Sequence, residues 1–143
     1  MTAQELWEKS GLTGEYEAWA FGDAPDALAE LTARGIKTAT SSAYELYAIE
    51  GEALPRVGEY SVILNSKEEA VCIVKTTAVS VVPFDEVTAL HAWKEGEDDR
   101  SLQNWRRVHR EFFTRELSAL QRAFSEKTLV VCEEFEAVFN ARD

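Results

Sequence analysis

The chain has 143 residues, of which 45% are hydrophobic and 29% charged, a composition typical of a single soluble globular domain. Its formal net charge of −11 excludes a protein that holds polyanions on a broad basic surface, so any nucleic-acid contact must be local or the ligand small. No stretch approaches the roughly 18 consecutive apolar residues of a membrane span, and Met1–Ser10 is too polar for a secretory signal. We therefore expect one cytoplasmic domain over residues 1–143, with no membrane partner.

The first part of the chain is predicted to alternate between short helices and strands. Thr2–Lys9 has the spacing of a short helix, and Tyr16–Phe21 alternates aromatic and small residues as a strand does. Asp23 is expected to cap a second helix, because Pro25 fits the first turn of that helix and Gly35 fits its end.

The run Gly35–Ser42 (Gly-Ile-Lys-Thr-Ala-Thr-Ser-Ser) places one lysine, Lys37, among four hydroxyl side chains. A lysine held at a structured junction is a candidate ligand contact, because its compact ammonium carries three donors and burial lowers its pKa. The alternative is a helix end followed by a solvated lysine. The run lacks the Gly-x-x-x-x-Gly-Lys-Ser/Thr spacing of a phosphate-binding P-loop, and it leads into a short helical stretch around Tyr44 and Tyr47.

The clearest strand pattern lies in the middle of the chain. Tyr60–Leu64 and the longer Ala70–Val82, rich in Val, Ile and Thr, are separated by a polar turn and predict a hairpin. Thr128–Phe139 is predicted to be a closing strand. Cys72 and Cys132 lie in apolar runs of these strands, positions typical of buried thiols in a reducing compartment.

Charge is segregated in the C-terminal part of the chain. Asp85–Asp99 carries six acids against one lysine, and Arg100–Arg122 carries six arginines against two acids. Helices are predicted at Thr88–Trp93 and from Ser101 onward, with the polar loop Glu95–Asp99 between them. The arginine-rich segment is either a solvated helix face or a local nucleic-acid contact.

Several separated pieces of the sequence follow one family pattern in the right order: Gly35–Thr40, Ser61–Asn65, Cys72–Thr77, Val82–Val87, Glu95–Leu102, Trp105, Arg106, His109, Phe112 and Phe113. On these pieces the chain resembles the ASCH domain, a PUA-like β-barrel family linked to RNA metabolism, and in particular its longer bacterial branch. The resemblance and the order of the elements predict an α+β fold, with a small mixed PUA-like barrel of about five or six strands flanked by helices.

The resemblance also implies candidate catalytic residues. One ASCH branch is similar to small amidohydrolases that remove the acetyl group from N4-acetylcytidine, and another, closer in length to this chain, is described as ribonuclease-like. The amidohydrolase pattern falls on Lys37, Thr40 and Glu95. The lysine would act as nucleophile or base on an amide carbonyl, the glutamate would carry the proton to the leaving amine, and the threonine would orient them or bind the oxyanion.

Other residues near this pattern are expected to contact the ligand. Where the family often has an arginine two residues after the threonine, this chain has Ser42, so Arg100 or Arg106 is the candidate replacement. The expected ligand contacts, which include three aromatic rings on which a base can stack, are Thr38, Ser42, Tyr44, Tyr47, Trp93, Arg100 and Arg106.

Three functions stay open on this evidence. The first is a hydrolase of a modified pyrimidine nucleoside, the second an RNA-binding module or metal-assisted ribonuclease using Arg100–Arg122, and the third a binder of a nucleotide-like ligand. No cofactor is expected, although the carboxylates of Glu95–Asp99 offer a hard cation such as magnesium an alternative site. His109 is expected to be a partly buried, hydrogen-bonded residue rather than a catalytic base. The oligomeric state is not fixed by the sequence.

Overall fold

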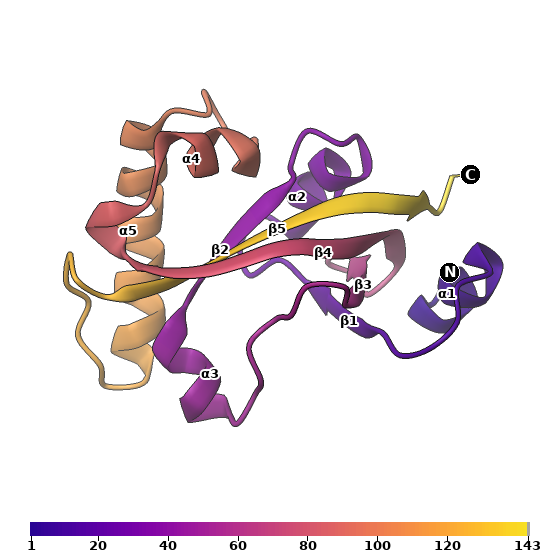
Figure 1. Ribbon diagram of the computed structural model, residues 1–143, viewed down its shortest axis with the longest axis horizontal. Helices are drawn as coiled ribbons and strands as arrows, with labels where there is room; N and C mark the ends of the chain where they lie inside the picture. Colours follow the sequence, from indigo (N-terminus) through magenta and orange to yellow (C-terminus); the bar gives the residue numbers. More distant parts are fainter. Residues whose placement is uncertain (143) are drawn as a thin grey trace.

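The computed structural model describes residues 1–142. The elements in chain order are α1 (Ala3–Ser10), β1 (Glu17–Ala20), α2 (Pro25–Ala33), β2 (Ala39–Ala43), α3 (Tyr44–Glu50), β3 (Tyr60–Leu64), β4 (Ala70–Pro83), a 3₁₀ turn (Phe84–Glu86), α4 (Ala89–Glu95), α5 (Leu102–Ala119) and β5 (Leu129–Asn140). The strands of the described residues form one five-stranded sheet in the order β1-β3-β4-β5-β2 (Figure 1).

The sheet is mixed and curls on itself. β1 pairs with β3 in parallel, and the other neighbouring pairs are antiparallel. The long pair β4 and β5 shifts register at Ile73/Val74 and at Thr76/Ala78, and such bulges bend and twist a strand pair. As a result β1 and β2, which lie at opposite edges of the sheet, line the same cleft. The predicted mixed α+β barrel is therefore confirmed as a five-stranded half-barrel within residues 1–142.

The apolar core is divided among the helices that pack on the sheet. At one end of β4 and β5, α4 and α5 cover a cluster that includes Phe84, Trp105, Phe113 and Leu117, while α1 lies near the other end (Figure 1). Helix α2 covers a second cluster on the central strands. Cys72 and Cys132 are buried free thiols, as the apolar runs around them predicted, and each belongs to one of these clusters. Burying a large apolar side chain contributes about 1.5–3 kcal/mol, so these clusters are the main source of stability.

No helix among residues 1–142 combines the length and the hydropathy needed to cross a bilayer.

The structure differs from the sequence analysis in two places. Asp23 does not cap α2: the N-cap is Ala24, in the left-handed region with φ 43°, and it makes no side-chain cap hydrogen bond. The Asp23 carboxylate instead lies 3.6 Å from the Arg115 guanidinium. The second difference is β2, which the sequence pattern did not indicate. Ala39–Ala43 contains only small residues, and it is a strand because its backbone pairs with β5.

Gly96 sets the distance between the loop after α4 and the loop before β2. Its φ is +71°, and a Cβ at this position would lie 2.6 Å from the carbonyl oxygen of Ile36. The absence of a side chain therefore lets Glu95 and Glu97, the neighbours of Gly96, approach Lys37, the neighbour of Ile36. The backbone carbonyl cannot move aside as a flexible side chain would.

We expect Gly96→Ala to lower the free energy of unfolding by about 3 kcal/mol, because strain from the left-handed backbone adds to a clash with a carbonyl oxygen. Gly51→Ala is the matched control. Gly51 is also a helix C-cap with a left-handed φ of +70°, but nothing lies within 4 Å of the place that an alanine methyl group would occupy, so only about 1 kcal/mol should be lost. Urea denaturation measures both values. Equal losses would contradict the close approach described above.

Candidate functional site

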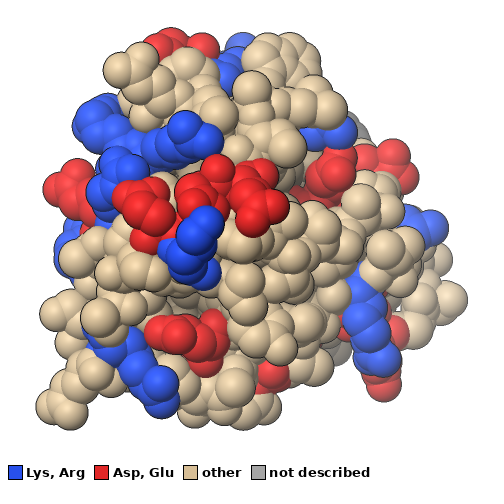
Figure 2. All heavy atoms as spheres, turned by 60° about the vertical axis from the view of Figure 1, so that its left-hand side comes forward, with Lys and Arg blue, Asp and Glu red and all other residues tan. Residues whose placement is uncertain are grey.

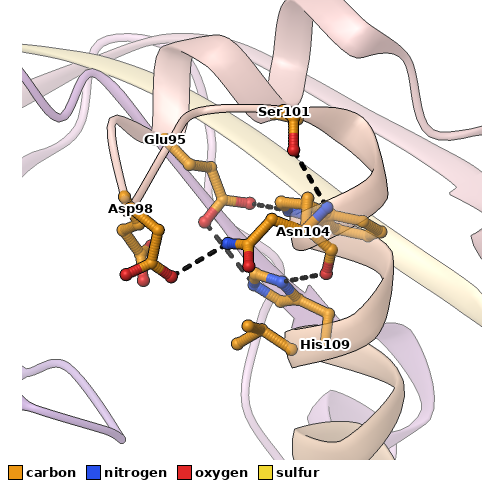
Figure 3. Close-up of a pocket in the computed structure, with 9 residues that line it drawn as sticks. Glu95, Asp98, Ser101, Asn104 and His109 are labelled. Carbon is orange, nitrogen blue, oxygen red and sulfur yellow. Dashed lines mark hydrogen bonds and ion pairs between the residues drawn. The ribbon is translucent and has the colours of Figure 1, made fainter.

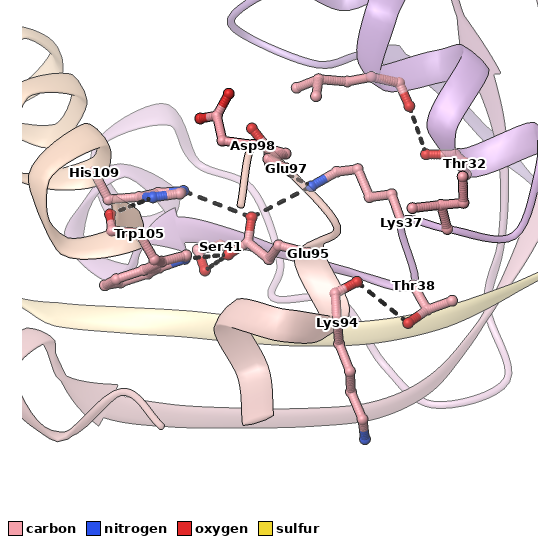
Figure 4. A network of polar contacts seen from close by, with 12 residues as sticks. Thr32, Lys37, Thr38, Ser41, Lys94, Glu95, Glu97, Asp98, Trp105 and His109 are labelled. Carbon is pink, nitrogen blue, oxygen red and sulfur yellow. Dashed lines mark hydrogen bonds and ion pairs between the residues drawn. The ribbon is translucent and has the colours of Figure 1, made fainter. Parts of the chain in front are cut away.

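The site is centred on a buried lysine that contacts two glutamates. The Lys37 side chain is 1% exposed, and its Nζ lies 3.3 Å from Glu95 Oε1 and 2.8 Å from Glu97 Oε2 (Figure 4). The ammonium also lies 5.1 Å from the centroid of the Phe21 ring. The lysine and glutamate that the family pattern pairs, 58 positions apart in the chain, therefore meet in the fold. The alternative of a solvated lysine at a helix end is wrong.

Glu95 is the hub of this site, with its side chain 2% exposed and both carboxylate oxygens in use. Its Oε2 accepts hydrogen bonds from the indole Nε1 of Trp105 and from Ser41 Oγ, each at 2.5 Å, and lies 3.1 Å from His91 Nε2. Its Oε1 lies 3.6 Å from His109 Nε2. One buried carboxylate is thus surrounded by donors from β2, α4 and α5.

The helices place these donors by their periodicity. Glu95 and His91 are four residues apart near the C-terminal end of α4, so both project from the same face. Trp105 and His109 have the same spacing on α5, where their rings stack with centroids 4.3 Å apart. His109 Nδ1 lies 2.9 Å from the Trp105 carbonyl oxygen, which directs Nε2 toward Glu95. The hydrogen-bonded, largely buried His109 agrees with the expectation from the sequence.

The two carboxylates have pKa values that are shifted in opposite directions. Burial by itself would raise the pKa of Glu95, but the Lys37 ammonium and the two imidazoles outweigh it and hold the pKa well below its ordinary value. For Glu97, burial raises the pKa, and the neighbouring Glu95 carboxylate adds to this effect against the attraction of Lys37. Glu95 is therefore a permanent anion at neutral pH, and Glu97 is the carboxylate of the pair that exchanges a proton more readily.

The two imidazoles bind protons more tightly than free histidine. Burial lowers the pKa of His91, but hydrogen bonds and charge interactions with Cys132 and Glu95 outweigh it and raise the pKa to about 9. Glu95 likewise raises the pKa of His109 against the effect of burial. A protonated His91 donates from Nε2 to its neighbours, which include Ser41 Oγ at 2.7 Å. It stabilises the anion and has no lone pair with which to act as a base.

A small pocket lies on the α5 side of Glu95. Its lining includes Asp98, Ser101, Asn104 and His109 (Figure 3), and its volume is about 10 Å³. This volume is enough for about one water molecule and far too small for a nucleoside. This pocket therefore does not hold a nucleoside beside Glu95.

The half-barrel has a larger cleft, with a volume of about 680 Å³, and neither Lys37 nor Glu95 is part of its lining. Ser41 and Phe21 belong both to the wall of this cleft and to the surroundings of the Lys37–Glu95 pair. Among residues 1–142, the lining contains no lysine or arginine but includes six glutamates: Glu17, Glu50, Glu52, Glu59, Glu116 and Glu133. The cleft is therefore strongly acidic, while the pair behind its wall is rich in donors.

Three of the predicted site residues lie in the wall of the cleft. Thr40 and Ser42 are on β2 and Tyr47 is on α3, where the Tyr47 hydroxyl lies 2.7 Å from Ser42 Oγ. Within residues 1–142, no hydrogen bond joins the Thr40 hydroxyl to Lys37 or Glu95, so the expected group of three is not assembled by direct contact.

The other predicted ligand contacts lie outside the cleft. Thr38 bonds through its backbone N–H and its hydroxyl to the Lys94 carbonyl, and Tyr44 is exposed at the start of α3. Trp93 is 54% exposed, but the Arg100 guanidinium stacks 3.7 Å from its ring centroid. The Arg106 guanidinium donates to the Asp85 carbonyl at 3.4 Å. These side chains, apart from Tyr44, already have partners within the protein.

The arginine-rich segment does not form a uniform basic surface. Figure 2 shows lysine and arginine side chains next to aspartate and glutamate on the side of the molecule that carries α4 and α5. Arg110 forms an ion pair with Glu126 at 2.8 Å, and the Arg115 guanidinium lies over the Phe112 ring. The solvated, partly paired helix face fits this arrangement better than a phosphate-binding face.

The acidic loop Glu95–Asp99 does not converge on a common point. Its first two glutamates hold Lys37, Asp98 accepts from Asn104 at 2.9 Å, and Asp99 accepts from the backbone of Ser101 at 2.9 Å. No group of three or more metal-ligating side chains comes together in the described chain.

The sequence analysis assigned no role to four residues that the structure makes functional candidates: Ser41, His91, Glu97 and Glu133. Ser41 and Glu97 belong to motifs that the sequence did point to, and His91 lies on the helix predicted at Thr88–Trp93, but spacing alone does not show which hydroxyl, imidazole or carboxylate joins the site. Glu133 carries a weak signal, a charged residue within the mostly apolar start of β5.

Comparison with known proteins identifies relatives. The family model of the ASCH domain matches residues 17–139. An ASCH domain from Lactobacillus crispatus JV V101 is 33% identical, with a TM-score of 0.87 over 96% of this chain and 94% of that one. A protein from Enterococcus faecalis V583 is 34% identical, with a TM-score of 0.85 over 96% of this chain and 85% of that one. No curated protein matches the sequence.

We expect Glu95→Gln to lower the free energy of unfolding at pH 7 by about 3–5 kcal/mol, because a buried ammonium and two imidazoles lose their anion. Glu134→Gln is the control: Glu134 pairs with Lys94 at a half-exposed position, where the loss should stay below about 1 kcal/mol. Urea denaturation of both variants measures the difference. A loss at Glu95 as small as that at Glu134 would contradict its role as hub.

The stability should also depend on pH through His91. Because the folded pKa of about 9 exceeds the ordinary value of 6.5, the stabilisation is fully present below pH 6.5 and is lost as the pH rises through about 9. The full shift corresponds to about 3 kcal/mol. Wild type should therefore lose stability over this range relative to His91→Gln, as measured by urea denaturation at several pH values. Parallel pH curves for the two proteins would contradict the raised pKa.

Proposed function

The chain belongs to the ASCH domain family, a PUA-like fold generally linked to RNA binding, and from this premise we propose that it hydrolyses an amide of a small nucleoside, an N4-acylated cytidine. The observation that carries the proposal is the buried Lys37–Glu95 pair directly behind the wall of a large acidic cleft. The nucleoside would bind in the cleft, and Lys37 and Glu95 would act on its amide group.

The size and charge of the cleft support a small uncharged ligand. Ligand pockets typically have volumes of about 300–1,000 Å³, and the cleft lies within this range. Its glutamates would repel a chain of phosphates, whereas a neutral nucleoside meets no such barrier. The cleft also contains aromatic rings on which a base can stack, and the lining rings are Trp19, Phe21, Tyr47 and Phe112.

The opposite pKa shifts of Glu95 and Glu97 indicate different roles for the two carboxylates in the proposed reaction. Glu95 stays ionised and fixes the position of Lys37, so it is a poor carrier of protons at neutral pH. Glu97, with its raised pKa and its contact of 2.8 Å to Lys37 Nζ, is better suited to take a proton from the lysine. The proton shuttle that the family pattern assigns to Glu95 is therefore proposed for Glu97.

In the proposed reaction, Lys37 passes a proton to Glu97, and the lysine nitrogen then accepts a proton from water while the water oxygen forms a bond to the amide carbon. Thr40, whose residue lines the cleft, would donate a hydrogen bond to the developing oxyanion. The C–N4 bond then breaks, the nitrogen takes a proton from Lys37, Glu97 returns its proton to the lysine, and cytidine and acetic acid leave. Direct attack by the Lys37 amine is the other route open to the same residues.

The alternative function, RNA binding or cleavage at Arg100–Arg122, has less support from the surface. Arg100, Arg106, Arg110 and Arg115 have acidic, aromatic or carbonyl partners, and the face is mixed in charge. A steep fall of affinity with salt would be the signature of this alternative, since each phosphate contact releases counterions.

We expect wild type to release cytidine from N4-acetylcytidine, as followed by chromatography, and Lys37→Met to lower kcat/KM at least about 100-fold. Lys94→Met is the control, because Lys94 is a half-exposed lysine paired with Glu134, and its activity should match wild type. Circular dichroism checks that each variant is folded. If Lys37→Met does not fold, Thr40→Val should show a loss of about tenfold or more through the oxyanion contact.

No release of cytidine by folded wild type would overturn the hydrolase proposal. In that event, tight and salt-dependent binding of a structured RNA by the same protein would favour the RNA-binding alternative.

A further inference from the structure

Glu133 is a buried carboxylate in the cleft that the proposed chemistry does not use. It lies on β5, opposite Thr40 of β2 in the register of the sheet, and is 7% exposed. Its Oε2 accepts a hydrogen bond from Thr76 Oγ1 at 2.8 Å. Its other oxygen has no hydrogen-bond donor among residues 1–142, and Glu133 lines the cleft.

This carboxylate also lacks a cation. Among residues 1–142 no lysine, arginine or histidine forms an ion pair with Glu133, in contrast to Glu95, which has three cationic neighbours. Burial therefore raises the pKa of Glu133, and the neighbouring Glu59 and Glu17 add to this effect. The free oxygen of Glu133 is not among the fully buried atoms without a partner, so it faces the cleft and can accept a hydrogen bond from a ligand there. Groups of this kind in a cleft are candidates for binding a ligand.

The surroundings of Glu133 indicate the chemistry of that ligand. Aromatic rings of the cleft provide flat apolar contacts, and the carboxylate provides an acceptor in the wall of the same cleft. Planar heterocycles with an amino N–H at the edge combine the two complementary features. A carboxylate accepting from the N4 amino group is a recognised way to read cytosine.

We propose that Glu133 determines the specificity of the cleft by accepting a hydrogen bond from the exocyclic amino or acylamino N–H of the bound base. This inference rests on the proposed function and adds the contact by which the site selects its base. An N4-acylated cytidine keeps one N–H on the same nitrogen, so substrate and product both offer the required donor. A base without this N–H leaves the buried carboxylate unpaired, and sites built for such a donor reject analogues that lack it.

The test compares the binding of cytidine and of 2-pyrimidinone riboside, which lacks the amino group, by calorimetry. Wild type should bind cytidine at least about tenfold more tightly, since a hydrogen bond to a charged group is at stake. Glu133→Met, which removes the acceptor but keeps an unbranched side chain of similar length, should bind both nucleosides equally. Glu133→Gln, which keeps an acceptor oxygen, should retain a preference for cytidine.

Glu136→Met is the matched control, because Glu136 lies on the same strand but is exposed, and it should behave as wild type. Equal affinity of wild type for the two nucleosides would overturn the inference without any variant, so the test stands even if Glu133→Met fails to fold. Discrimination retained in folded Glu133→Met would overturn it as well. In both cases nucleoside binding, and with it the proposed function, would stand. Wild type that binds neither nucleoside would instead overturn the proposed function and the inference together.

Discussion

The contact between Lys37 and Glu95 is the constraint on which the site depends. It joins the segment before β2 to the end of α4, and through Trp105 and His109 it fixes α5 against both. A buried ammonium is tolerated only with anions beside it, and the anion in turn is tolerated only with its surrounding donors. Loss of Glu95 would leave Lys37, His91 and His109 without a shared anion, which makes the cluster a single unit rather than a set of independent pairs.

The wall of the cleft separates two different electrostatic environments. The cleft side is lined by glutamates, whereas the buried side gathers a lysine, two imidazoles, a hydroxyl and an indole N–H around Glu95. Ser41 and Phe21 form part of the wall between them. This arrangement disfavours polyanions at the entrance and still offers donors to a carbonyl that reaches the wall. Under the proposed function, this arrangement reconciles a net charge of −11 with a fold generally linked to RNA binding.

Much of the fold follows from local sequence patterns, but the site follows from tertiary structure. The hairpin of Tyr60–Leu64 with the long strand after it, and the helix that begins after Ser101, were predicted because their periodicity and capping are strong. The meeting of Lys37 with Glu95 was implied by the family pattern and could not follow from spacing. β2 was missed because its small residues carry no strand pattern. The burial of Glu133 depends on the curl of the whole sheet, which no local pattern records.

The most direct test of the account is where ligands bind, mapped by amide chemical-shift changes in a nitrogen-15 NMR titration. Cytidine is predicted to shift amides of β2 and the part of β5 around Glu133, with the exposed face of α5 unaffected. A short single-stranded RNA at physiological salt is predicted to cause little change at the same sites. Shifts confined to Arg100–Arg122 on adding RNA, with no response to cytidine, would contradict the central claim that the acidic cleft is the ligand site.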